Sequence, residues 1–203
     1  MSVLNNLSSA LGRNDDEPNK DLGMELARNR DKDGIREIIE NLRNKDKRIQ
    51  VDCLSVLEQV GKLAPELIED SVENLMTLAL GKNNRLIWAA MIDLALIADR
   101  KPKEIYKWFD DLVKVYEAGS VITQDNGIKI FAKIASTGTG YDVIWPFLME
   151  QLKTCRPKSV AQYGESIHLA VTDENRKEFQ AVLNARLISL SDAQKKRVAK
   201  LLK

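Results

Sequence analysis

Four apolar segments of the chain end at a constant spacing. They are RIQVDCLSVLEQV (48–60), RLIWAAMIDLALI (85–97), ITQDNGIKIFAKI (122–134) and SVAQYGESIHLAV (159–171). Their last residues, Val60, Ile97, Ile134 and Val171, are each 37 residues apart. Self-similarity at a fixed period of this length is typical of repeat architectures, so we expect stacked structural units rather than one layered core.

Matching positions within the four segments carry matching chemistry. One position is small in every segment: Cys53, Ala90, Gly127 and Gly164. Another is large and apolar in the first three segments and histidine in the fourth: Leu57, Leu94, Phe131 and His168. On a helix these positions share one face, so each segment is predicted to be a helix with a buried stripe. The small residue would let a neighbouring helix approach closely.

A second helix is predicted before each of these segments. The periodic stretches cover 35–42, 72–80, 105–116 and 143–152, and the apolar residues Ile38, Leu75, Leu112 and Met149 again lie 37 residues apart. Polar and turn residues separate the helices at NKDK, GKNN, ADRKPK, EAGS and ASTGTG. Each unit is therefore a helix pair, which must stack on its neighbours to bury its apolar face.

The stretch NKDKRIQVDCLSVLEQVG (44–61) resembles the second-helix signature of a HEAT repeat. It has Asp46 in the turn, then basic Arg48 and small Cys53. GKNNRLIWAAMIDLALIAD (81–99) repeats the pattern with Arg85 and Ala90. The resemblance to the HEAT/armadillo superfamily implies an all-α, right-handed α-solenoid of about five stacked helix pairs.

Two regions are expected along the chain. Residues 34–203 are predicted to form the repeat array, with a least regular fifth unit at 175–202 that ends in a basic helix. Residues 1–33 are predicted to form an N-terminal cap of two helices, over 3–11 and 21–30, joined by a polar loop. Terminal units of a solenoid need a polar outer face, which explains their irregular sequence.

Composition narrows the functional classes. The 203 residues include 31 Lys and Arg and 30 Asp and Glu, so the formal charge is +1, which argues against a dedicated duplex-binding domain. The longest apolar run, Leu86 to Ala98, contains Asp93 and is shorter than the roughly 20 residues that span a bilayer. Two cysteines, without a zinc spacing, favour a reducing compartment. The expected location is the cytoplasm, with no membrane contact and no cofactor.

An apolar strip on the second helix of repeat two is the candidate binding surface. Trp88, Ile92 and Leu96 point away from the predicted core face at 100° per residue. In the resembled family, second helices line the concave surface. The expected groove consists of Val51, Trp88, Ile92 and Leu96, flanked by Asp125, Lys129, Gln162 and Tyr163. The alternative is that neighbouring repeats bury the strip.

No catalytic group is predicted. His168 shares a position with core residues and is expected to be buried and hydrogen-bonded. Cys53 is expected to be an inert packed thiol, and Cys155 a surface thiol near basic residues. Asp93 shares a position with apolar residues, so it either reaches a partner at the edge of the core or marks a small rotation of its helix.

The segment NRDKDGIREIIE (29–40) resembles a calcium loop. Asn29, Asp31, Asp33 and Glu40 occupy ligand positions, and Gly34 supplies the turn. Arg36, however, stands where such a loop needs an apolar residue. The favoured interpretation is a helix start at which Asp31 and Asp33 face the positive end of the helix.

The sequence favours a non-enzymatic module that binds a protein or peptide on its second-helix face. One alternative is a nucleic-acid-binding protein resembling the HEAT-like DNA alkylation-repair glycosylases, for which Trp88, Trp108 and Trp145 would supply aromatic rings. A further alternative is an enzyme resembling the HEAT-like chromophore lyases. The sequence offers no cluster of titratable residues to carry out that chemistry.

Overall fold

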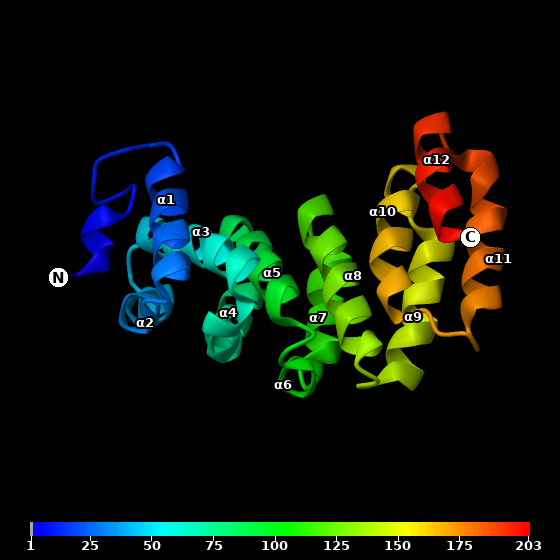
Figure 1. The fold of residues 1–203 in the computed structure, drawn as a ribbon, viewed down its shortest axis with the longest axis horizontal. Helices are drawn as coiled ribbons and strands as arrows, with labels where there is room; N and C mark the ends of the chain where they lie inside the picture. Colours follow the sequence, from blue (N-terminus) through cyan, green and yellow to red (C-terminus); the bar gives the residue numbers. More distant parts are fainter. Residues whose placement is uncertain (1) are drawn as a thin grey trace.

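The structure is a computed structural model that describes residues 2–203, an elongated stack of helices with the two chain ends at its opposite ends (Figure 1). These residues form twelve α-helices and several short 3-10 turns, without a strand. The first helices of the pairs are α2 (Lys32–Glu40), α4 (Val72–Ala79), α6 (Pro102–Tyr106) with α7 (Phe109–Ala118), α9 (Tyr141–Thr154) and α11 (Arg176–Arg186). The second helices are α3 (Lys47–Leu63), α5 (Asn84–Ile97), α8 (Val121–Ser136), α10 (Pro157–Ile167) and α12 (Asp192–Leu201).

The second helices form a continuous layer. Helix α1 (Glu17–Asn29) packs on α3, and the contacts continue through α5, α8 and α10 to α12. Helices α2, α4, α6, α7 and α9 pack mainly on the second helix of their own pair or of the preceding one, whereas α11 packs mainly on α9. The arrangement is a solenoid in which every unit contacts only its neighbours.

The 37-residue pattern is confirmed in the core. Ile38, Leu75, Leu112 and Met149 are all fully buried, as are Leu57, Leu94 and Phe131. The small position is buried in all four units. A Cβ atom on Gly127 would lie 3.0 Å from the Tyr116 ring, and one on Gly164 would lie 3.0 Å from Leu201. The helices therefore leave little room for a larger side chain at these two positions.

Polar turn residues begin the second helices. The side chains of Asp46, Asn83 and Ser120 accept hydrogen bonds from backbone N–H groups in the first turns of α3, α5 and α8. Ser191 and Gln194 form a reciprocal capping box at α12. Each such cap typically contributes about 1 kcal/mol to stability.

The N-terminal region differs from the prediction. The prediction of a helix over 3–11 was wrong. Val3–Asn6 (η1) forms a 3-10 turn, and irregular turns follow as far as Gly12, where φ is +68°. Helix α1 begins at Glu17, with Pro18 in its first turn, and it lies in the second-helix layer. The division into a cap of residues 1–33 and an array of residues 34–203 stays a prediction, and residue 1 lies outside the described part.

Two further elements depart from the pattern. The first helix of repeat three is broken at Lys107 and Trp108 into α6 and α7. The prediction of a buried His168 was wrong. Helix α10 ends at Ile167, and His168 lies in the exposed 3-10 turn η5 (His168–Ala170), with its ring 6.0 Å from the Phe179 ring. The change from α to 3-10 geometry rotates the side chain out of the buried stripe.

Candidate peptide-binding surface

The apolar strip predicted on α5 lies on one side of that helix. Trp88, Ile92 and Leu96 follow one another at intervals of four residues, and each is half-buried. Leu96 also packs against the core, and its Cδ1 would lie 2.8 Å from a Cβ atom on Gly61 of α3. The close approach of α3 therefore fixes the C-terminal end of the strip, whereas Trp88 and Ile92 lie nearer the start of α5.

An N-terminal loop lies over the neighbouring part of α3. The Ser9 amide donates to Asp52 Oδ2 at 2.8 Å, and the Ser55 hydroxyl donates to Asp16 Oδ2 at 2.8 Å. A polar cavity of about 250 Å³ remains between this loop, Val51 and the α3 and α5 arginines Arg48 and Arg85. Val51 is half-buried and packs against the core. The loop therefore bounds the strip at the N-terminal end of the array.

The predicted polar flank comes together around a second cavity. Asp125, Lys129 and Gln162 line one cavity of about 310 Å³ between α8, α10 and α12. Burial raises the pKa of the Asp125 carboxyl, and Arg156 and the Gln162 amide act in the opposite direction. The cavity walls carry both charge signs, because Glu165 and Arg197 also line it.

Tyr163 is not on this surface. Its side chain is 2% exposed and is part of the core, so its assignment to the rim of a groove was wrong. Burial and the neighbouring Tyr116 hydroxyl raise the pKa of Tyr163 well above its usual value. Residue 163 is one step of 100° from Gln162, and that step turns the ring toward the first-helix layer.

The local geometry argues against the calcium-loop alternative. Asp31 caps α2 by accepting a hydrogen bond from the Gly34 amide at 2.9 Å, and Asp33 pairs with Arg36 at 3.0 Å. Asn29 is the last residue of α1, and Glu40 is the last residue of α2. Positions 32–40 are helical, so their side chains radiate around an axis and do not converge on one ion. The described residues contain no group of three or more His, Cys, Asp or Glu side chains placed to hold a metal ion.

Asp93 is the polar group that sequence reasoning left unresolved. Its side chain is completely buried, and neither carboxylate oxygen has a hydrogen-bond partner. Burial raises the pKa of Asp93 well above its ordinary value; Glu58 raises it further, and Lys62 lowers it. Burial therefore favours the neutral form of this carboxyl group at the α3–α5 contact.

Neither thiol is activated. Burial raises the pKa of Cys53 to about 12, as expected for a packed thiol. Cys155 is half-buried, and burial raises its pKa although Arg186 acts in the opposite direction. A thiolate nucleophile at neutral pH needs a lowered pKa, so neither residue has the character of a catalytic cysteine.

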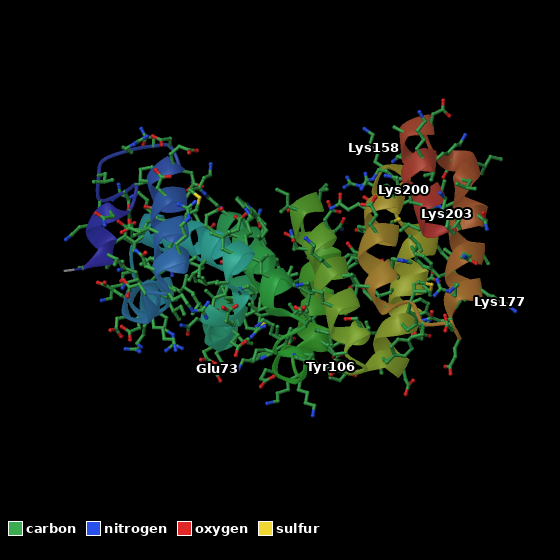
Figure 2. All side chains as sticks on the ribbon, in the orientation of Figure 1. Glu73, Tyr106, Lys158, Lys177, Lys200 and Lys203 are labelled. Carbon is green, nitrogen blue, oxygen red and sulfur yellow. The ribbon has the colours of Figure 1, made fainter. Side chains whose placement is uncertain are left out.

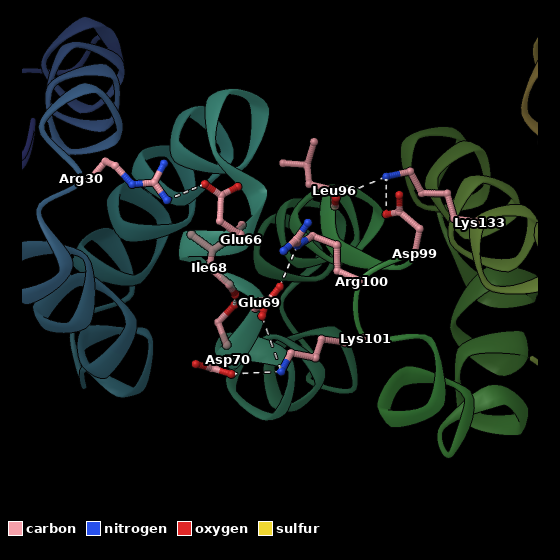
Figure 3. Close-up of polar contacts among 11 residues, drawn as sticks. Arg30, Glu66, Ile68, Glu69, Asp70, Leu96, Asp99, Arg100, Lys101 and Lys133 are labelled. Atoms are coloured by element: carbon pink, nitrogen blue, oxygen red, sulfur yellow. Dashed lines mark hydrogen bonds and ion pairs between the residues drawn. The ribbon is translucent and has the colours of Figure 1, made fainter. Parts of the chain in front are cut away.

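Many charged side chains already tie one repeat to the next. Arg30 pairs with Glu66 at 2.8 Å, and Arg100 pairs with Glu69 at 2.6 Å. Lys133 donates to both Asp99 and the Leu96 carbonyl, and these contacts are drawn in Figure 3. These pairs lie at the ends of the helices, on the side of the stack opposite to the turns that begin the second helices.

Basic residues gather at the C-terminal end of the molecule. Figure 2 shows Lys158, Lys200 and Lys203 on or beside α12, with Lys177 on α11. Arg197 of α12 forms an ion pair with Glu165 at 2.6 Å. Among residues 2–203, no helix is long and apolar enough to cross a membrane.

Comparisons with known proteins place the fold. The sequence matches no protein-family model, and no curated protein matches it significantly. An engineered protein of known structure is similar over 100% of this chain and 96% of its own, with 19% identity and a TM-score of 0.69. A designed armadillo repeat protein in complex with the peptide (KR)4 is similar over 97% of this chain and 92% of its own, with 13% identity and a TM-score of 0.72.

A third similar structure belongs to a much longer protein. The karyopherin Kap121p bound to the SUMO protease Ulp1p aligns with 82% of this chain, at 19% identity and a TM-score of 0.64. The present chain covers only 18% of that protein. These likenesses, with the helix pairs described above, show an all-α solenoid of the armadillo/HEAT-like repeat class.

Proposed function

We propose that the chain is a non-enzymatic module that binds a protein or peptide on its second-helix face. The observation that supports this function is the half-buried pair Trp88 and Ile92, which remains partly open to solvent in the middle of α5. Tryptophan in the centre of a surface with polar surroundings is the residue type that most often dominates binding energy. Asp125, Lys129 and Gln162 would supply hydrogen bonds at the side of this apolar centre.

The similar structures support the class of partner. One designed armadillo protein was crystallised with a peptide, and the karyopherin was crystallised with a protease. Those ligands belong to those proteins, and their chemistry does not identify a ligand for this chain. What supports the proposal is that proteins with this fold bind a peptide in one case and a protein in the other.

The test begins with peptides selected by display against the purified chain. Their affinities are then measured by fluorescence anisotropy for the wild type and for Trp88→Ala and Ile92→Glu. We expect each substitution to weaken binding by about 2 kcal/mol or more, which is a hot-spot effect. Ile188→Glu is the matched control, because Ile188 is 94% exposed in the turn before α12. Peptides that bind all variants equally would refute this face as the binding site.

A further inference from the structure

A separate cleft lies at the edge of the stack where the second helices begin. It has a volume of about 530 Å³ and lies between the turn after α4 and the turn after α7. Its apolar walls are Ala79, Leu80, Ile87, Val115 and Ala118. None of these residues belongs to the strip on α5 or to the cavity beside Asp125.

At the two following repeat junctions, long side chains bridge successive first helices. At the junction of repeats four and five, Arg186 is the last residue of α11 and donates to the Leu152 carbonyl at 2.8 Å and to carbonyls of the next turn. At the junction of repeats three and four, the Tyr116 hydroxyl reaches Gln151 at 2.9 Å. The last residue of α7 is Ala118, which is too short to fill the gap.

Lysines surround this apolar floor. Lys82 lines both the cleft and an adjoining hollow of about 270 Å³, which Lys47 also lines. Within residues 2–203, neither of these two lysines makes an ion pair. The acidic residue of the cleft, Asp111, is neutralised by Lys114 at 3.0 Å. The local charge is therefore positive.

Exposed apolar side chains continue beside the cleft. Leu80, on its wall, is 40% exposed, and Val121 and Ile122, between the lining residues Ser120 and Thr123, are 43% and 46% exposed. Three large apolar residues open to solvent around one hollow are more than the scattered single residues of an ordinary surface.

We propose that this cleft is a second docking site, which takes an apolar side chain of a peptide that also carries carboxylates. The apolar anchor would lie between Ile87 and Val115, and the carboxylates would meet Lys82 and Lys47. The volume is in the range of about 300–1,000 Å³ that ligand sites occupy. The positive charge of the rim complements an acidic segment and selects against a basic one.

The probes are three fluorescein-labelled dodecapeptides. The first has one central Phe flanked by Glu, the second replaces Glu with Lys, and the third replaces Phe with Ala. Anisotropy titrations at low salt are expected to show binding of the first alone. Ala118→Met would fill the cleft and Lys82→Glu would reverse its charge, so each should weaken that binding about tenfold or more.

Matched controls separate this site from the rest of the molecule. Ala181→Met and Lys103→Glu change exposed residues on α11 and α6 and should leave the affinity unchanged. Equal or tighter binding of the Lys peptide, no binding of the Glu peptide, or an unchanged affinity in Ala118→Met would overturn the proposal. Loss of binding in Trp88→Ala with full binding in Ala118→Met would also overturn it, and would place the peptide on the second-helix face.

Discussion

Replacing Asp93 by valine should stabilise the protein. The carboxyl group is 0% exposed and neither oxygen has a hydrogen-bond partner. The residues at the same position in the other repeats are Val56, Ile130 and Ile167, all completely buried. Valine is close to aspartate in volume, so it should fit this site without overpacking. An unpartnered buried polar group costs about 1–3 kcal/mol in proteins, and Asp93→Val removes that cost.

The gain should grow as the pH rises. The folded-state pKa of Asp93 is raised, so above the unfolded-state value of about 3.9 the unfolded chain loses a proton that the folded chain retains. Wild-type stability therefore falls as the pH increases, until the pH reaches the folded pKa. The slope is about 1.4 kcal/mol per pH unit for this one group while the pH lies between the two pKa values. The valine variant lacks this contribution to the pH dependence of stability.

Urea unfolding, followed by circular dichroism at pH 5, 6 and 7, measures both effects. Asp93→Asn is the informative control, because it removes the titration but keeps an unpartnered polar side chain. We expect both variants to lack this pH dependence, and Asp93→Val to be more stable than Asp93→Asn by the same amount at each pH. A difference between Asp93→Val and the wild type that stays the same from pH 5 to pH 7 would refute the conclusion that this carboxyl group is neutral in the folded protein.

Two further predictions concern packing. Gly23→Ala should lower the free energy of unfolding by about 1–3 kcal/mol, because its Cβ would lie 2.6 Å from the Val56 carbonyl oxygen. The control is Gly12→Ala, whose Cβ would meet nothing within 4 Å, so that it measures only the effect on backbone conformation. Equal losses of stability in urea unfolding would contradict the packing argument. Cys53 should resist iodoacetamide at pH 8 in the folded chain, because burial raises its pKa to about 12, and it should react once the chain is unfolded. Mass spectrometry of the alkylated peptide measures this reaction. Rapid labelling of the native protein would contradict the prediction.

The repeat architecture was predictable because the spacing of apolar residues within each helix pair is a local feature of the sequence. Helix pairs with Ile38, Leu75 and Leu112 at equal spacing bury the same face in each unit, and short-range patterns are sufficient to show this. The convergence of Asp125, Lys129 and Gln162 follows from the same register.

The features that sequence reasoning missed depend on geometry beyond the period. A change from α to 3-10 backbone at the end of α10 exposes His168, and nothing in the apolar pattern signals it. One step of helical rotation decides whether Tyr163 lies in the core or on a rim. The cleft at Ala118 forms because no long side chain at the end of α7 fills the space beside α4, and this is visible only once the repeats are stacked.

Helix α1 lies in the second-helix layer, and η1 packs on α2, where Glu37 accepts hydrogen bonds from the Ser2 hydroxyl and the Val3 amide. One carboxylate therefore anchors two groups of the segment that precedes α1. Glu37→Ala would release both groups at once, so the attachment of this segment to the first repeat depends on a single side chain.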